Sequence, residues 1–355
     1  MSANKLDVLS LLSPQMRAVL EKESELAGDA NDTSASLEEM RENYVAARAY
    51  WVEGGPAMEA SVDSCVPGPY GEIPVRFYYP TAEAAEAAEA RASSLPSVPA
   101  IVYAHGGGFV LGNLETHDRI CRILAEKTQA VVVAVDYRLS PEAKFPSAVR
   151  EVAAVALYLH ENGAQHGVDG GRLSFAGDSG GAHLGLAATM YLREEKGGSA
   201  YIRCLLLYYG WFGLSDSSSM RLLGGPWDGL AEEDWQFYLR MYADDPAELP
   251  ANRYANLFLN DLTQDVPACY VAAAELDPLL DDSATLAAIC RQYGTPCVYE
   301  VFEGVLHAFL HYTKMLDAAN DALEHGAAFF RQQLGLKENL SSAPKAKESV
   351  GNVRR

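Results

Sequence analysis

Short apolar runs and longer amphipathic segments alternate along the chain from about residue 73 to residue 334. An apolar run of about four to eight residues is typical of a buried strand, whereas apolar residues spaced three or four apart indicate a helix with one buried face. The pattern predicts strands at residues 73–79, 99–104, 130–137, 173–176, 202–209, 268–274 and 297–302, and helices at residues 116–127, 146–161, 181–196, 283–293 and 317–334. This alternation predicts an α/β protein with a doubly wound, mainly parallel sheet that is flanked by helices on both faces.

Two parts of the chain interrupt the alternation. Near the N-terminus, Ser13 followed by a proline can begin one amphipathic helix, and Ser36 with Glu39 forms a capping box at the start of a second. Residues 215–265 are irregular and rich in tryptophan and tyrosine, which indicates one or two short helices inserted in the sheet. Both parts either extend the core or form a helical cap over an active site.

These patterns divide the chain into segments. We predict N-terminal helices over residues 1–60, a main α/β domain formed by residues 61–214 and 266–336, and a cap insertion at residues 215–265. Residues 337–355 are polar without hydrophobic periodicity, and we expect them to be disordered. Residues 81–94 consist mostly of Ala and Glu. We interpret them as an exposed insertion with marginal helical character, whose role stays open.

The predicted strand at residues 173–176 enters the next predicted helix through Gly-Asp-Ser-Gly-Gly, residues 177–181. A turn this tight forces Ser179 into a strained backbone conformation, which flanking glycines permit because they carry no Cβ. The Ser179 hydroxyl then projects at the positive end of a helix, in the position of a nucleophile. The same letters surround the serine of chymotrypsin-like proteases, but those are all-β proteins whose base and acid precede the serine. The strand-to-helix context favours a nucleophile elbow.

Three glycines, Gly106 to Gly108, follow His105 at the end of the predicted strand 99–104. They could form a flexible turn or a phosphate-binding loop, but neither Gly-Lys-Ser/Thr nor a G-x-G-x-x-G that opens a helix is present. The alternative is an oxyanion hole, because glycines leave backbone N–H groups free to point at a developing negative charge. Each such donor typically stabilises the transition state by about 3 kcal/mol.

A general base and an orienting acid are expected at the carboxyl ends of other strands, where the sites of doubly wound sheets form. Asp277 lies just past one predicted strand, and His307 lies in the loop after the last one. The chain order Ser179, Asp277, His307 is that of the α/β-hydrolases.

Other residues compete for these roles. His311 is the alternative base, and Asp281 and Asp282 are the alternative acids, although we expect these two to cap the next helix. His183 is one helical turn beyond the serine and is expected to pack within its helix. The remaining histidines fall in or near predicted helices, and no histidine spacing indicates a metal site.

The net charge of −20 argues against a nucleic-acid partner or an anionic membrane surface. Six cysteines form no C-x-x-C pair and lie mostly in apolar runs, which favours reduced thiols and a reducing compartment. The first residues lack a basic segment followed by an apolar stretch, and no run approaches membrane-spanning length. We therefore expect a globular cytoplasmic protein.

Five motifs, taken in order, resemble the hormone-sensitive-lipase branch of the α/β-hydrolases, the GDXG lipolytic enzymes. They are His105-Gly-Gly-Gly-Phe, Asp136-Tyr-Arg-Leu-Ser-Pro-Glu, Gly177-Asp-Ser-Gly-Gly, Asp277-Pro-Leu-Leu-Asp and His307-Ala-Phe. Residues 111–118, 221–230 and 306–312 look closer still to the bacterial acetyl esterases. The resemblance implies an α/β-hydrolase fold and a cytoplasmic carboxylesterase for acetyl to butyryl esters that needs no cofactor.

The resemblance also assigns roles to individual residues. It implies a triad of Ser179, Asp277 and His307, and an oxyanion hole at His105, Gly106, Gly107 and Gly180, with the backbone N–H groups of the three glycines as donors. The family usually has Ala where this chain has Gly180, so the elbow is expected to be more flexible.

Two other functions stay open beside a short-chain esterase. One is an amidase or a deacetylase of one metabolite on the same fold, and the other is a regulatory binding protein that retains an esterase scaffold. An intact triad argues against the second, because a binding protein does not need all three groups. The expected partner is a small-molecule ester, and a homodimer is an open alternative to a monomer.

Overall fold

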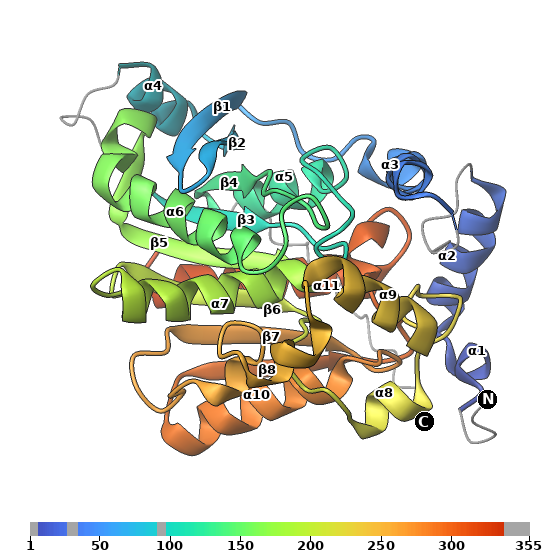
Figure 1. The fold of residues 1–355 in the computed structure, drawn as a ribbon. Coiled ribbons are helices and arrows are strands. Elements are labelled where there is room, and N and C mark those ends of the chain that lie inside the picture. The colour runs from blue at the N-terminus through green and yellow to red at the C-terminus, as the bar shows by residue number, and fades with distance from the viewer. Residues whose placement is uncertain (1–5, 27–34, 91–96, 337–355) are drawn as a thin grey trace, which may run out of the picture.

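The computed structural model describes residues 6–26, 35–90 and 97–336, and these form one eight-stranded sheet with helices on both faces (Figure 1). The strands follow the order β1-β2-β4-β3-β5-β6-β7-β8 across the sheet. Their bounds are β1 (Ala60–Gly68), β2 (Gly71–Tyr79), β3 (Val98–Ala104), β4 (Val131–Val135), β5 (Val168–Asp178), β6 (Ile202–Tyr208), β7 (Ala268–Ala274) and β8 (Cys297–Phe302). Strand β2 pairs antiparallel with β1 and β4, and the other pairs are parallel. The predicted mainly parallel α/β sheet is confirmed.

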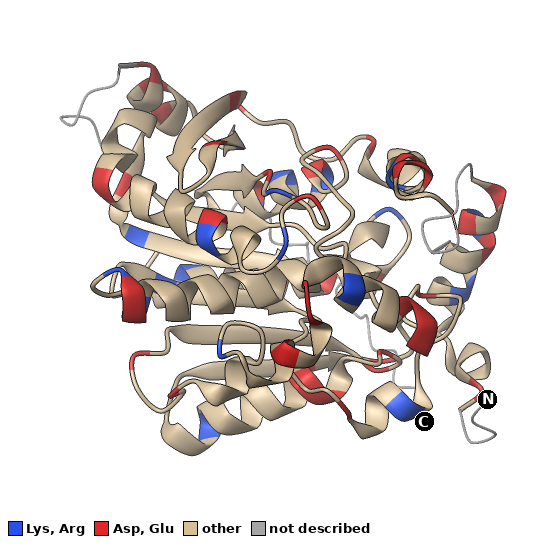
Figure 2. Ribbon diagram, viewed as in Figure 1, with Lys and Arg blue, Asp and Glu red and all other residues tan. Residues whose placement is uncertain are grey.

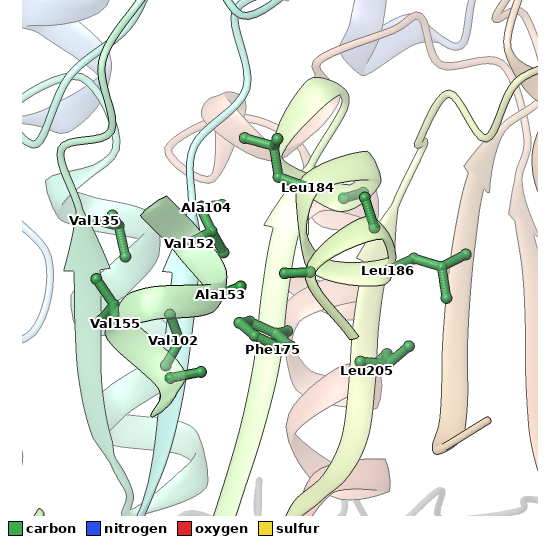
Figure 3. Packing of buried hydrophobic residues seen from close by; sticks show 14 of the residues in the cluster. Val102, Ala104, Val135, Val152, Ala153, Val155, Phe175, Leu184, Leu186 and Leu205 are labelled. Atoms are coloured by element: carbon green, nitrogen blue, oxygen red, sulfur yellow. The ribbon is translucent and has the colours of Figure 1, made fainter. Parts of the chain in front are cut away.

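Helices bury the two faces of the sheet in separate apolar clusters. On one face lie α6 (Ser147–Asn162), α7 (Gly180–Glu195) and α10 (Leu280–Tyr293), and on the other lie α5 (Asp118–Thr128) and α11 (Asp317–Gln333). Figure 3 shows side chains of α6 and α7 packed against β3, β4, β5 and β6. Strands covered on both faces need apolar residues at every position, which explains why the sequence showed them as unbroken apolar runs.

The N-terminal segment begins with α1 (Val8–Leu11), α2 (Pro14–Glu25) and α3 (Leu37–Val52). The predicted helix starts are confirmed: the Ser13 side chain accepts from the Met16 N–H at 3.1 Å, and Ser36 and Glu39 form the capping box. Trp51 of α3 is buried in the same apolar cluster as α5 and α11.

The insertion between β6 and β7 contains α8 (Ser218–Leu222), α9 (Glu232–Tyr242) and two 3-10 turns, η2 (Pro246–Ala251) and η3 (Leu257–Leu259). Figure 1 shows α3, α8 and α9 at the end of the sheet where the parallel strands finish. Acidic residues are distributed over the outer helices and loops, including α9 and α2 (Figure 2).

Two sequence expectations are corrected here. Strand β1 was not predicted, because as an edge strand it is largely exposed and has no apolar run. The Ala/Glu segment is not simply exposed: residues Ala82–Ala90 form helix α4, in which Ala84 and Ala87 are buried. A Cβ at Gly167 would lie 2.7 Å from the Ala84 carbonyl oxygen, so this helix packs closely on the turn before β5.

The predicted disordered tail at 337–355, and the part of the Ala/Glu segment at 91–96, lie outside the described residues. In the part of the chain that the structure describes, no helix is long and apolar enough to cross a membrane.

Candidate active site

Ser179 occupies the tight turn between β5 and α7. Its backbone angles are φ 53° and ψ −121°, an uncommon conformation for a residue with a side chain, and its N–H donates to the Tyr208 carbonyl oxygen at 2.9 Å. A Cβ on Gly177 would lie 2.5 Å from the backbone of Gly181, and a Cβ on Gly181 would overlap the Ala104 carbonyl oxygen. Both positions therefore require glycine, and the structure contains the tight strand-to-helix turn that the sequence predicted.

The fold brings Ser179, His307 and Asp277 into one hydrogen-bonded chain. Nε2 of His307 lies 2.8 Å from Oγ of Ser179, and Nδ1 of His307 lies 2.7 Å from Oδ2 of Asp277. Asp277 is fully buried after β7, and its other oxygen accepts from the Leu279 N–H at 2.8 Å. This bond fixes the rotation of the carboxylate toward His307.

The surroundings of His307 favour its charged form. Burial acts to lower the pKa of His307, but the charge of Asp277 and its hydrogen bond outweigh burial and raise this pKa above 6.5. The Tyr209 ring lies edge-on against the imidazole, with ring centres 5.0 Å apart. His307 can therefore accept a proton from Ser179 and stabilise it beside Asp277.

The glycine loop after β3 corrects the expected set of oxyanion donors. The Gly106 N–H is already donated to Oδ1 of Asp178 at 3.0 Å, so this group is not free. His105 is buried, and its Nδ1 lies 2.8 Å from the Gly106 carbonyl oxygen. Neither residue lines the cavity at Ser179, whereas Gly107, Gly108 and Gly180 do.

The cavity at Ser179 is small, about 70 Å³, and several aromatic side chains line it. Helix α3 contributes Tyr44 and Arg48, and α9 contributes Trp235 and Tyr238. Its apolar lining also includes Phe109, Trp211, Leu230, Leu239, Tyr242 and Leu279. Gly108, at φ +59°, lies against the Tyr238 ring, which a Cβ would approach to 2.6 Å. The N-terminal segment and the insertion thus enclose the same space.

The competing base, His311, makes no hydrogen bond to Ser179. His311 lies in the 3-10 turn η4 (Phe309–Tyr312), its ring packed against His117 rather than hydrogen-bonded to Ser179. His183 is buried in α7 as expected, with its ring nitrogens 3.0 and 3.1 Å from the carbonyl oxygens of Trp211 and Tyr254.

The competing acids support the insertion instead of capping the next helix. Both belong to the first turn of α10, but Oδ1 of Asp282 accepts the backbone N–H groups of Phe212, Gly213 and Leu214. Burial raises the pKa of Asp282 to about 7. Asp281 accepts the Ser219 N–H at 2.9 Å. Their expected helix-capping role is therefore corrected: they hold the start of the insertion.

Two charged residues in the cavity wall were missed by sequence reasoning. Oδ1 of Asp228 accepts the N–H groups of Gly225 and Leu230, Oδ2 is buried without a hydrogen-bond partner among the described residues, and burial raises the pKa of Asp228 to about 6. Arg48 is buried in α3 and pairs with Glu23 at 3.3 Å. The sequence did contain a signal for Arg48, because this charged residue lies on the apolar face of the predicted helix, between Tyr44 and Trp51.

Comparison with known proteins agrees with this architecture. A family model described as alpha/beta hydrolase fold matches residues 101–311. A hyperthermophilic esterase from the archaeon Pyrobaculum calidifontis is 31% identical, and the match covers 91% of this chain and 99% of that chain with a TM-score of 0.81. EstE1, a thermophilic and thermostable carboxylesterase cloned from a metagenomic library, is 30% identical over 85% of this chain and 98% of that chain, with a TM-score of 0.76.

The chain therefore belongs to the α/β-hydrolase family. Within this family, its motifs and its esterase neighbours assign it to the hormone-sensitive-lipase branch of carboxylesterases. The resemblance in the sequence is confirmed to that level, and the narrower similarity to acetyl esterases stays a prediction.

Proposed function

We propose that this protein is a serine carboxylesterase that hydrolyses short-chain acyl esters, from acetyl to butyryl. The observation that carries the proposal is the hydrogen-bonded chain from Oγ of Ser179 through His307 to Asp277, with contacts of 2.8 and 2.7 Å. A nucleophile, a base and an orienting acid in this geometry are the parts that acyl transfer requires.

The reaction begins when Ser179 attacks the ester carbonyl carbon and gives its proton to Nε2 of His307. Asp277 accepts a hydrogen bond from Nδ1, which keeps Nε2 unprotonated before the attack and stabilises the imidazolium after it. The tetrahedral intermediate collapses, the C–O bond to the alcohol breaks, and the alcohol takes the proton from His307. Water then attacks the acyl-enzyme by the same route, with His307 again as base, and releases the acid and free Ser179.

The negative oxygen of the intermediate needs donors that are not already bonded elsewhere. We assign this role to the backbone N–H groups of Gly107, Gly108 and Gly180, because these three residues line the cavity beside Ser179. Gly106 is left out because its N–H is bound to Asp178. Losing one donor of this kind typically costs about 3 kcal/mol of transition-state stabilisation.

The preference for short acyl groups rests on the walls of the cavity. A volume of about 70 Å³ lined in part by aromatic side chains leaves little room for added methylenes. Forcing them in would displace packed rings, which typically costs about 1–3 kcal/mol. Residues 1–60 and 215–265 supply much of this wall, so we assign them to a cap over a catalytic domain made of residues 61–214 and 266–336.

Two broader expectations also belong to this proposal. All six cysteines are free thiols, which supports a reducing, cytoplasmic location. A homodimer stays a prediction, and sedimentation of the purified protein measures it directly.

The proposal is tested with purified protein and p-nitrophenyl esters of increasing chain length. We expect kcat/KM to be highest between two and four acyl carbons, and Ser179→Ala to lose several orders of magnitude of activity while keeping its circular dichroism spectrum. A maximum at ten or more carbons contradicts the short-chain assignment. Undiminished hydrolysis by folded Ser179→Ala protein contradicts the mechanism, and faster cleavage of p-nitroacetanilide than of p-nitrophenyl acetate points to an amidase.

A further inference from the structure

Three buried side chains outside the proposed triad form a cluster next to the nucleophile elbow: His117, Asp178 and His311. One ring nitrogen from each histidine and one carboxylate oxygen of Asp178 all lie within 4.8 Å of one another. His117 immediately precedes α5, Asp178 ends β5, and His311 lies in η4. The three residues are 1%, 1% and 3% exposed, so water does not compensate their polar groups.

Hydrogen bonds determine which nitrogen of His117 carries a proton. The Thr116 hydroxyl lies 2.9 Å from the Asn113 carbonyl oxygen and 2.9 Å from Nδ1 of His117. The carbonyl oxygen can only accept, so the single hydroxyl proton is donated to it, and Nδ1 of His117 must donate to Thr116. In neutral His117, Nε2 is therefore unprotonated. Its lone pair faces Oδ1 of Asp178 at 3.4 Å.

A lone pair beside a carboxylate is repulsive unless a cation joins them. Nε2 of His117 and Nε2 of His311 are both buried without a hydrogen-bond partner among the described residues. Such unpaired buried groups typically cost about 1–3 kcal/mol each. A proton on His117 would satisfy one contact and leave His311 unpaired, whereas one metal ion can accept a lone pair from both rings and from the carboxylate.

We propose that His117, Asp178 and His311 bind one divalent transition-metal ion of the zinc class, and that the bound ion inhibits ester hydrolysis. Two imidazoles and one carboxylate suit Zn²⁺, Co²⁺ or Ni²⁺, whereas Mg²⁺ and Ca²⁺ prefer oxygen ligands only. Ligand distances of about 2.0–2.2 Å require the three side chains to rotate slightly toward the ion. A water molecule can complete the coordination.

An ion can reach the cluster through the proposed active site, because Asp178 also lines the cavity at Ser179. The positive charge of Arg48, which acts on His311, is paired with Glu23 at 3.3 Å. Oδ1 of Asp178 already accepts from the Gly106 N–H and from the Tyr103 hydroxyl. An ion on this carboxylate competes with both donors and loosens the loop that carries Gly107 and Gly108, so kcat falls.

Co²⁺ tests the proposal directly, because its visible absorption reports the ligands around it whether or not the enzyme turns over. Protein freed of metal with a chelator is titrated with Co²⁺, and p-nitrophenyl acetate hydrolysis is followed in parallel. We expect one equivalent to bind, the absorption and the loss of activity to share a midpoint, and Zn²⁺ to displace Co²⁺.

Matched variants locate the site. His117→Gln and His311→Gln should each lose both the absorption and the inhibition. His325→Gln removes an exposed histidine that pairs with Glu300 at 3.1 Å and should change neither. His307→Gln should lose hydrolysis but keep the absorption, which separates this proposal from the proposed esterase mechanism. Circular dichroism checks the folding of each variant.

Substitution of a buried histidine can unfold the chain, so anomalous diffraction from a Co²⁺-soaked wild-type crystal gives an independent location. A peak between the two histidines and Asp178 supports the site. The site is overturned if the peak lies at His307 or His325 or if no peak is found. It is also overturned if both His117→Gln and His311→Gln still bind one equivalent of Co²⁺. Binding at the cluster with full activity overturns the inhibitory role.

Discussion

The backbone N–H of Gly106 donates a hydrogen bond to Oδ1 of Asp178 over 3.0 Å. The residue before the proposed nucleophile thus holds the start of the glycine loop, 72 positions earlier in the chain. The Tyr103 hydroxyl donates to the same oxygen at 2.7 Å. Burial acts to raise the pKa of Asp178, but positive charge on His117 or His311 and the hydrogen bond from Tyr103 act to lower this pKa below its usual value. The elbow and the loop therefore form one rigid unit around an ionised carboxylate.

Replacing Asp178 by Ala should uncouple this unit. The Gly106 N–H and the Tyr103 O–H would both lose their acceptor inside the protein, and each loss typically costs about 1–3 kcal/mol. We expect the free energy of unfolding, measured with urea, to fall by about 2–6 kcal/mol, and kcat to fall with it. Glu126→Ala, at an exposed position of α5, is the control. A change within about 1 kcal/mol, no larger than that of the control, would contradict this account.

The candidate triad could be predicted from the sequence because its three residues follow the carboxyl ends of strands. Ser179 follows the buried second half of β5 and Asp277 follows the fully buried β7, whereas His307 lies in the loop after the partly exposed edge strand β8. All three strands are mostly apolar in sequence, and their carboxyl ends meet at one edge of the sheet. The oxyanion donors depend instead on which N–H groups are free. Gly106 was misassigned because its bond to Asp178 joins two segments that have no sequence relationship.

Contacts between distant segments explain the other omissions. In the sequence, His117 had no evident partner, His311 was only an alternative base, and no histidine spacing indicated a metal site. The fold nevertheless brings their rings to a centroid distance of 4.6 Å. Strand β1 is defined by its antiparallel pairing with β2 rather than by its own composition. Arg48 reaches the cavity only because α3 packs over the end of the sheet.

Asp277→Asn should lower kcat strongly, whereas Asp281→Asn should not. Asparagine keeps the size of the side chain but can donate to Nδ1 of His307, which favours the tautomer with a proton on Nε2, and in serine proteases this lowers kcat by about 10⁴. We expect a loss of that order for Asp277→Asn. Asp281 contacts the Ser219 N–H and not His307, so its substitution should change kcat less than about tenfold, the factor that corresponds to about 1.4 kcal/mol.

The comparison is made with p-nitrophenyl acetate under identical conditions, with folding checked by circular dichroism. Asp282→Asn is the third variant, and it should act on stability, because Asp282 accepts three buried backbone N–H groups. If Asp281→Asn loses activity and Asp277→Asn keeps it, the orienting acid of the triad has been misassigned.

The pH profile should report the raised pKa of His307. The base must be neutral to accept the Ser179 proton, so kcat/KM is full at higher pH and falls as pH drops through the pKa of His307. Asp277 raises this pKa above 6.5 despite burial, so the midpoint of the acid limb should lie above 6.5. Asp228 also acts to raise this pKa, and Asp228→Asn should therefore move the midpoint to lower pH.

Asp281→Asn is the control for this shift, because its carboxylate makes no contact with His307 and its variant should keep the wild-type midpoint. The measurement is kcat/KM from pH 4 to 9 with protein that stays folded throughout. A midpoint below 6 in the wild type, or a shift to higher pH in Asp228→Asn, would contradict the electrostatic argument.

Adjacent glycines in the elbow should respond to alanine in opposite ways. A Cβ on Gly180 would meet the Phe109 ring at 3.1 Å, a tight contact that a shift of a few tenths of an ångström relieves, whereas a Cβ on Gly181 would overlap the Ala104 carbonyl oxygen. Gly180 is the first residue of α7 with no strained φ, so Ala there reduces the freedom of the unfolded chain and should stabilise the protein by about 0.4–1 kcal/mol. The Gly180 N–H is unaffected, so kcat should stay within about threefold of wild type, a barrier change below about 0.7 kcal/mol.

Gly181→Ala should fail to fold or lose activity altogether. Thermal unfolding and p-nitrophenyl acetate turnover of both variants decide the matter, and a destabilised Gly180→Ala protein would mean that Phe109 cannot move.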